Sequence, residues 1–148
     1  MDAVAFLINE HNKVRKSFTD ILEGSHRDET TAKMFNLLCD DLIRHETMEQ
    51  EIWYPHLKRN EKLSEIITHL IAEEKSAKKT IKEFRKIKDA KEWNKKFMKF
   101  KREVEHHARE EETKLFPKVK KILTENELLS LGKMMREYKR DYLQLMAA

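Results

Sequence analysis

Hydrophobic residues recur every three or four positions along most of the chain, which is the spacing of one face of an α-helix. This pattern predicts helices over residues 2–22, 30–57, 63–87 and 91–123, and a fifth that begins at Thr124 and ends near the C-terminus. Thr124 and Glu127 have the spacing of a capping box, which marks a helix start. No segment shows the sustained alternation of β-branched residues that indicates a strand. We therefore expect an all-α protein.

Short connections separate the first four predicted helices. Gly24 follows the first helix, Arg59 and Asn60 follow the second, and residues 88–90 follow the third. Short connections place consecutive helices antiparallel, so we expect an up-down-up-down four-helix bundle with an additional C-terminal helix. The length suits one domain over residues 1–148, with the bundle in 1–123 and the last helix in 124–148.

Composition agrees with long helices and narrows the class of protein. Charged and hydrophobic residues each make up 39% of the chain, with only two Gly and two Pro, so few tight turns are expected. The net charge is +4, but basic and acidic residues are interspersed, which is typical of a solvated helix surface and not of nucleic-acid binding. The single Cys39 cannot form an intramolecular disulfide, and no signal peptide or transmembrane segment is recognisable. We expect a cytoplasmic protein without a nucleic-acid or membrane partner; the oligomeric state stays open.

One phrase occurs twice, as residues 45–55 (HETMEQEIWYP) and residues 107–117 (HAREEETKLFP). In both, Glu follows His by four positions, an apolar pair comes next, and Pro closes the phrase. His and Glu at this spacing project from the same face of a helix. Each Pro falls late in its helix, so a kink or an irregular turn is expected there. Residues 1–58 and 63–120 thus resemble one helix pair written twice.

Polar residues interrupt the apolar faces of these helices, and they are His or Glu. A buried carboxylate costs several kcal/mol unless it is protonated, paired or bound to a metal. Two Glu and three His directed at one axis would therefore destabilise a dry core, whereas a pair of cations would remove the problem. Mixed nitrogen and oxygen donors suit iron or manganese and do not suggest structural zinc. The predicted ligands on these helices are His11, His45, Glu49, His107 and Glu111.

The third predicted helix leaves two alternatives open. His69 and Glu73 repeat the His-x-x-x-Glu spacing, although they lie toward the edge of the apolar face. Glu74 stands where His11 stands when the two halves are superposed. We expect His69 with Glu73 to be ligands, because a two-metal site needs nitrogen donors from this side too, and Glu74 is the alternative.

Each of these residues also has a purely structural explanation. His11 alone would more often be a hydrogen-bonded core histidine, and a His-Glu pair four residues apart is common on a charged helix surface. Their shared position on the apolar faces argues against this. His26 and His56 are expected at the surface, and His106 points about 100° away from His107 around the helix.

The set of motifs resembles the hemerythrin-like, or HHE cation-binding, family over about residues 5–120. The resemblance implies a non-heme centre of two iron ions, with manganese possible, in which Glu49 and Glu111 bridge the metals together with an oxo or hydroxo group. His11 and His45 would bind one iron, and His69 and His107 the other. The matching positions are His11, His45-x-x-x-Glu49, His69 and His107-x-x-x-Glu111.

The chain departs from the oxygen-carrying members of that family at two places. Those proteins place two His one turn apart on the third helix, and Asp five residues after the His of the fourth. Here Glu73, and not a second His, lies one turn after His69, and Glu111 stands four residues after His107. The added negative charge should favour ferric iron, so we expect the site to bind or react with O2, peroxide or nitric oxide more readily than it stores O2. A non-catalytic iron or oxygen sensor or carrier is the alternative, a metal-free helical interaction domain is a second one, and enzymatic activity stays open.

Overall fold

The protein is built from five helical rods, seen in a computed structural model that describes residues 1–147. Ala148, the last residue of the predicted C-terminal helix, lies outside the described residues. The described part of the chain contains no strand, which confirms the all-α prediction, and every predicted helix is present with ends shifted by a few residues. The rods are α1 (Ala3–Glu23); α2 (Asp28–Met48), η1 (Glu49–Trp53) and α3 (Tyr54–Lys58) in succession; α4 (Glu61–Phe84); α5 (Ala90–Glu110), η2 (Glu111–Leu115) and α6 (Phe116–Ile122) in succession; and α7 (Glu125–Ala147).

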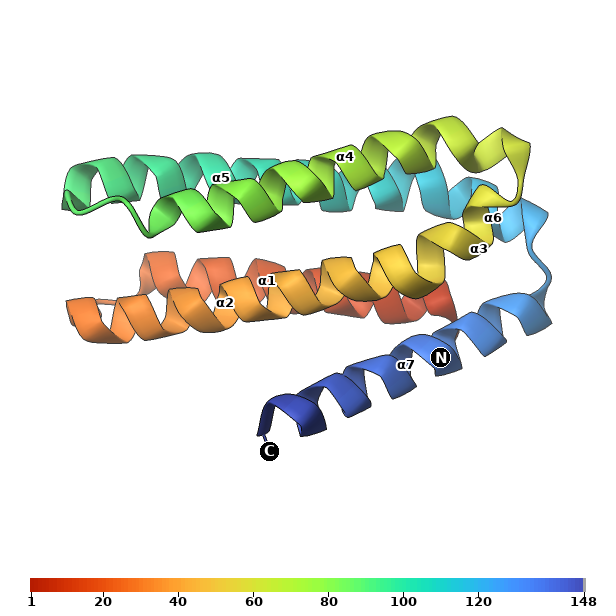
Figure 1. The fold of residues 1–148 in the computed structure, drawn as a ribbon, viewed down its shortest axis with the longest axis horizontal. Helices are drawn as coiled ribbons and strands as arrows, with labels where there is room; N and C mark the ends of the chain where they lie inside the picture. The colour runs from red at the N-terminus through yellow and green to blue at the C-terminus, as the bar shows by residue number, and fades with distance from the viewer. Residues whose placement is uncertain (148) are drawn as a thin grey trace.

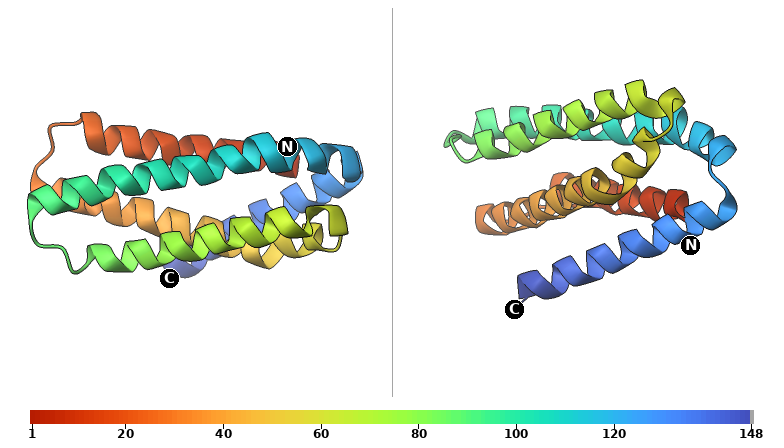
Figure 2. Two further views of the ribbon diagram at one scale, coloured as in Figure 1. Left: turned by 90° about the horizontal axis from the view of Figure 1, so that it is seen from above. Right: turned by 45° about the vertical axis from the view of Figure 1, so that its right-hand side comes forward.

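The first four rods lie side by side in two layers and alternate in direction (Figure 1). The pair α1 and α2 forms one layer, and the pair α4 and α5 forms the other (Figure 1). The last helix, α7, crosses the outer face of the α1–α2 layer, away from α4 and α5, as the right-hand view of Figure 2 shows. Within residues 1–147, no helix is both long and apolar enough to cross a membrane.

Two apolar clusters fill the interior at opposite ends of the rods. One cluster includes Trp53, Tyr54 and Leu115 and reaches α7 through Met135. The other cluster is rich in aromatic rings, and in it Phe35 lies 4.6 Å from Phe84 between ring centres. On each of the four rods, a buried His or Glu lies between the residues of one cluster and those of the other. The fold therefore places a polar layer across the middle of an apolar interior.

The single thiol belongs to the aromatic cluster. Cys39 is buried beside Leu38 and Leu42, and its burial raises the pKa of the thiol to about 12. Because the thiolate is the reactive form, this burial makes Cys39 less reactive than an exposed thiol, and its side chain packs as part of the core.

Helix α7 approaches the start of α1 at Gly132. A Cβ atom at this position would lie 2.8 Å from the carbonyl oxygen of Met1 and 2.9 Å from the backbone nitrogen of Ala3. The backbone of Gly132 has no positive φ angle, so the close packing explains the glycine and its conformation does not. Gly132 thereby lets α7 lie close against the N-terminal end of α1.

We predict that Gly132→Ala destabilises the protein by about 1–3 kcal/mol, because the added methyl group meets backbone atoms that cannot move aside. Helix propensity alone would make the same change stabilising by about 0.5–1 kcal/mol. Ser130→Ala, on the exposed side of α7, is the matched control and should be neutral or slightly stabilising. Urea unfolding of the three proteins tests this, and a Gly132→Ala protein as stable as the parent would contradict the packing argument.

Candidate metal centre

Six buried or partly buried side chains from the four rods form the polar layer. The carboxylates of Glu49 and Glu111 are fully buried, and that of Glu74 is 1% exposed. Every rod supplies at least one member, so the layer exists only when the rods are packed. The members are His11 from α1, His45 from α2, Glu49 from η1, Glu74 from α4, His107 from α5 and Glu111 from η2.

Glu49 and Glu111 each open a π-helical turn. The amide of Tyr54 donates to the carbonyl of Glu49, and that of Phe116 donates to the carbonyl of Glu111, which are five-residue steps. A proline follows directly in both rods and cannot donate the next helical hydrogen bond, so the wider turn accommodates it. The irregular turns predicted from the repeated phrase are present. Such turns are frequent at functional sites because they redirect side chains.

One group of donor atoms gathers around His11 and His45. One ligand atom from each of His11, His45 and Glu111 lies within 4.8 Å of the others. The Nε2 atom of His11 lies 3.7 Å from Oε1 of Glu111. The Nε2 atom of His45 lies 2.9 Å from Oε1 of Glu49, so Glu49 also reaches this group.

A second group adjoins the first and shares Glu111 with it. Ligand atoms of Glu49, Glu74, His107 and Glu111 also lie within 4.8 Å of one another. The Nε2 atom of His107 lies 3.1 Å from Glu74 Oε2 and 3.1 Å from Glu111 Oε1. Two overlapping sets of donors with two shared carboxylates match the requirements of two neighbouring cations.

A carboxylate faces the outer nitrogen, Nδ1, of each histidine in the layer. This leaves each Nε2 atom directed inward, toward the two groups of donors. An imidazole that ligates a metal characteristically makes such a contact with its other nitrogen, which fixes the tautomer and the ring orientation. The pairs are His11–Glu112 at 2.7 Å, His107–Glu73 at 2.9 Å and His45–Glu10 at 3.5 Å.

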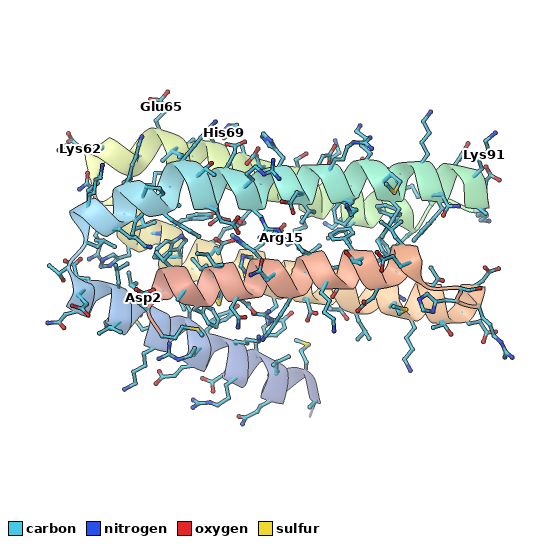
Figure 3. All side chains as sticks on the ribbon, turned by 180° about the vertical axis from the view of Figure 1, so that it is seen from behind. Asp2, Arg15, Lys62, Glu65, His69 and Lys91 are labelled. Carbon is cyan, nitrogen blue, oxygen red and sulfur yellow. The ribbon has the colours of Figure 1, made fainter. Side chains whose placement is uncertain are left out.

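Cationic side chains hold two of these outer carboxylates. Arg15 Nη1 donates to Glu112 at 2.9 Å, and Figure 3 shows Arg15 between α1 and α5. Arg44 Nη2 and Lys139 Nζ each donate to Glu10 at 2.8 Å. Since Lys139 belongs to α7, the C-terminal helix reaches the polar layer through Glu10. The sequence motifs did not identify these supporting residues, because charged side chains beside a ligand look the same as solvent-facing ones.

Glu74 is held by residues of the second rod. Gln50 Nε2 donates to Glu74 Oε1 at 3.0 Å, and the hydroxyl of Tyr54 donates to Glu74 Oε2 at 3.2 Å. Both donors come from the repeated phrase or its π-helical turn. The carboxylate of Glu74 is therefore oriented toward His107 before any ligand binds.

The inward atoms of the layer lack hydrogen-bond partners among the described residues. These atoms are the Nε2 atoms of His11 and His45 and both carboxylate oxygens of Glu49 and of Glu111. Several lie close to one another, yet not in the direction of a hydrogen bond. Buried polar groups left in this way cost free energy, and a carboxylate costs the most. The donor set therefore fits bound cations, which would satisfy all of these atoms at once.

Proton affinities in the layer reflect the crowding of carboxylates. Burial and the neighbouring carboxylates of Glu111 and Glu74 raise the pKa of Glu49 well above its usual range. Burial would also raise the pKa of Glu111, but His107 and His11 outweigh it and hold this pKa well below the usual range. Burial alone would lower the pKa of His11, yet the carboxylates of Glu111 and Glu112 raise it to about 9. In the absence of a metal, protons would take the place of cations.

The predicted ligands of the third rod lie elsewhere than expected. The side chain of His69 is 57% exposed and belongs to neither buried group, and Figure 3 shows it at the outer edge of α4. Glu73 faces the outer nitrogen of His107 and not the centre of the layer. Glu74, the alternative, takes the inward position. The geometry thus favours Glu74 over His69 and Glu73 as a ligand. The position of a residue around the helix axis, and not its residue type, determines whether its side chain points inward.

A cavity of about 610 Å³ opens beside the layer. Apolar side chains such as Val14, Phe18 and Val104 form part of its wall, and His11 and His107 are exposed to it. Glu46 also lines it, and burial together with the carboxylate of Glu74 raises the pKa of Glu46 to about 9. The cavity gives a small molecule a route to one side of the donor groups.

Comparisons with known proteins agree with this geometry. The family model of the hemerythrin HHE cation binding domain matches residues 2–119. The crystal structure of a hemerythrin HHE cation binding domain-containing protein from Mycobacterium kansasii superposes with a TM-score of 0.83 and 22% sequence identity, covering 100% of this chain and 93% of that one. At 22% identity, the similarity to this crystal structure shows a shared fold. No curated protein sequence matches the chain.

We predict that Glu49→Gln stabilises the metal-free protein by about 1–2 kcal/mol at pH 7. The raised pKa of Glu49 means that the folded protein takes up a proton which the unfolded chain does not bind at this pH, whereas an amide is neutral without one. Thermal or urea unfolding in excess chelator measures the effect. Glu51→Gln, an exposed change in the same turn, is the control and should have little effect. A loss of stability for Glu49→Gln in chelator would mean that the carboxylate layer is not a source of strain.

Proposed function

Since the chain belongs to the hemerythrin HHE cation binding domain family, we propose that its four-helix bundle, with the additional C-terminal helix, holds a non-heme di-iron centre that binds or reacts with O2, peroxide or nitric oxide. The observation that carries the proposal is the convergence of buried, unpartnered donor atoms in two overlapping groups. No other arrangement of charges in the described residues leaves so many ligand atoms without a partner.

The two groups suggest how the ligands divide between the metals. His11 and His45 would hold one iron, and His107 with Glu74 would hold the other. Glu49 and Glu111 reach both groups, which supports their role as bridging carboxylates. Glu74 thereby replaces the histidine that we expected at the second iron. Manganese prefers similar donors, so availability decides between the two metals.

When bound, the metal pair would supply redox chemistry and Lewis acidity toward a small ligand. The protein side chains set the conditions for that chemistry. The outer carboxylates fix the tautomers of the three histidines, and Gln50 and Tyr54 orient Glu74. The apolar cluster that contains Trp53 and Leu115 closes one side of the layer against water, while the cavity leaves the other side accessible.

The charge of the ligand set supports reaction in preference to storage. Three buried carboxylates, Glu49, Glu74 and Glu111, surround the proposed metals, and negative ligands stabilise the more highly charged ferric ions. A centre that strongly prefers the ferric state gives up an electron to O2 and does not easily return to the ferrous state. We therefore place this protein among those that consume or sense oxidants, with a cytoplasmic setting as a further prediction.

We predict that the protein, after gel filtration, contains about two iron ions per chain and that a chelator lowers its Tm, because metal binding adds to the free energy of unfolding. Glu111→Ala and Glu74→Ala should each lose the metal pair, measured by elemental analysis and visible absorption. His69→Ala should retain it, and His26→Ala is the surface control. A metal-free protein with a chelator-independent Tm would instead support a helical interaction domain.

We predict that the reduced protein consumes O2 irreversibly. Anaerobic reduction followed by exposure to air should give a ferric absorption spectrum that persists under vacuum, because the carboxylates favour ferric iron. Full recovery of the reduced spectrum under vacuum would make the protein a reversible carrier.

Peroxide separates an enzyme from a sensor. Continued loss of added peroxide over many equivalents per chain would establish turnover, whereas loss of about one equivalent per centre would indicate a sensing module. Glu111→Ala is the control in both experiments, since it removes a carboxylate shared by the two groups.

A further inference from the structure

A second cluster of metal-ligating side chains lies outside the buried layer, where α4 and α5 run side by side. It consists of two His-x-x-x-Glu pairs, one on each helix. His69 and Glu73 come from α4, and His106 and Glu110 come from α5. Each pair projects from one face of its helix, and the two faces meet. The side chain of His106 points away from the buried layer and into this cluster.

The four side chains converge closely. His69 Nε2 lies 3.2 Å from Glu110 Oε2 and 3.4 Å from Glu73 Oε2. His106 Nε2 contacts Glu110 Oε1 and lies 3.6 Å from Glu73 Oε2. Ligand atoms of His69, Glu73 and Glu110 all lie within 4.8 Å of one another. Each imidazole thus faces the carboxylates of both helices.

Burial within the cluster is graded. The two imidazoles are 57% and 64% exposed, whereas the carboxylate of Glu110 is 8% exposed. An ion would approach from solvent past the histidines and meet a buried carboxylate behind them. Glu110 has no contact with Lys or Arg among the described residues; its ion-pair partners there are these two histidines.

We propose that His69, Glu73, His106 and Glu110 form a second cation site, open to solvent, that binds a divalent first-row transition metal. Two imidazole nitrogens and two carboxylates are the donors that Zn²⁺, Fe²⁺ and Mn²⁺ accept. The helices hold two ligands each, so little chain entropy is lost when an ion binds. This site does not depend on occupation of the buried centre.

The surface site adjoins the buried layer through Glu73. Its Oε2 atom faces His69 and His106, and its Oε1 atom lies 2.9 Å from Nδ1 of His107. One carboxylate therefore belongs to the surface site and supports a histidine of the buried layer at the same time. For this reason Glu73 is unsuitable as a test position, and the two exposed histidines are the better choice.

Protonated histidines are the competing explanation. Two imidazolium ions beside two carboxylates would form a neutral network with the same contacts and would bind no metal. A surface ion pair of that ordinary kind occurs at His56, whose Nε2 atom lies 3.3 Å from Glu127 Oε2. His56 has one carboxylate partner and no second histidine, so it is a matched control.

Zinc titration of the purified holoprotein, followed by calorimetry and elemental analysis, tests the site. The parent protein and His56→Ala should each bind one Zn²⁺ more than the double variant His69→Ala/His106→Ala, which should lose that equivalent or bind it at least about tenfold more weakly. Both replaced side chains are exposed, so the double variant should fold, and circular dichroism checks this. Equal zinc binding by the parent and the double variant would overturn the proposal and leave a network of protonated histidines.

Glu111→Ala separates this proposal from the buried centre. It should lose metal from the buried layer and keep the Zn²⁺ equivalent that depends on His69 and His106. If the buried centre holds no metal, Glu111→Ala will leave the metal content unchanged, while the double variant will still lose one equivalent. The two proposals therefore fail in different and recognisable ways.

Discussion

The burial of negatively charged carboxylates inside an apolar bundle is the constraint on which the rest of the structure depends. Glu49 and Glu111 are fully buried between two hydrophobic clusters, where an unpaired charge is costly by several kcal/mol. Histidines lie beside these carboxylates in the interior. Outer carboxylates contact the other ring nitrogen of each histidine, and two arginines and a lysine donate to two of those outer carboxylates. Even α7, which lies outside the four rods, takes part through Lys139 and Glu10. The side chains that compensate for the buried carboxylates are therefore the same ones that could hold cations.

Adjacent glutamates on a helix serve separate purposes because each is turned about 100° from the next. Glu110 faces the exposed histidines, Glu111 faces the interior of the buried layer, and Glu112 supports His11 from outside. Glu73 and Glu74 divide in the same way on α4. Consecutive acidic residues, which in the sequence resemble an ordinary run of surface charges, thus belong to the surface cluster, to the buried layer and to the carboxylates that contact its histidines from outside.

The sequence was sufficient for the helices and for much of the polar layer. Apolar spacing located the five rods, and the positions of His11, His45, Glu49, His107 and Glu111 on apolar faces indicated which polar residues would meet. The choice between His69 and Glu74 depends on the rotation of α4 about its own axis. Small differences in packing decide this rotation, and the spacing of apolar residues does not define it to within one residue. The comparison of the two halves pointed to Glu74, whereas the preference for nitrogen donors pointed to His69.

Supporting residues were beyond the reach of the sequence for a different reason. In a chain with 39% charged residues, Arg15, Glu10 and Lys139 cannot be told from ordinary surface side chains by spacing. Their partners lie on other rods, so only the packed structure brings them together. Tyr54 was recognised as a member of the repeated phrase, but its hydroxyl contact with Glu74 follows from the π-helical turn that precedes it.

The two π-helical turns also determine how each rod may vary in length. A π-helical turn contains one residue more than the α-helical turn it replaces, so it resets the phase of the helix between the polar layer and the apolar cluster beyond it. If residues 49–53 formed a regular α-helical turn with no residue removed, Leu57 would be rotated by about 100° relative to His45. Loss of one residue within this turn would instead give a regular helix in which Leu57 keeps its orientation toward the interior. Each rod can therefore lose one residue at its π-helical turn, but not elsewhere between the polar layer and the apolar cluster, without turning the residues of that cluster away from the interior.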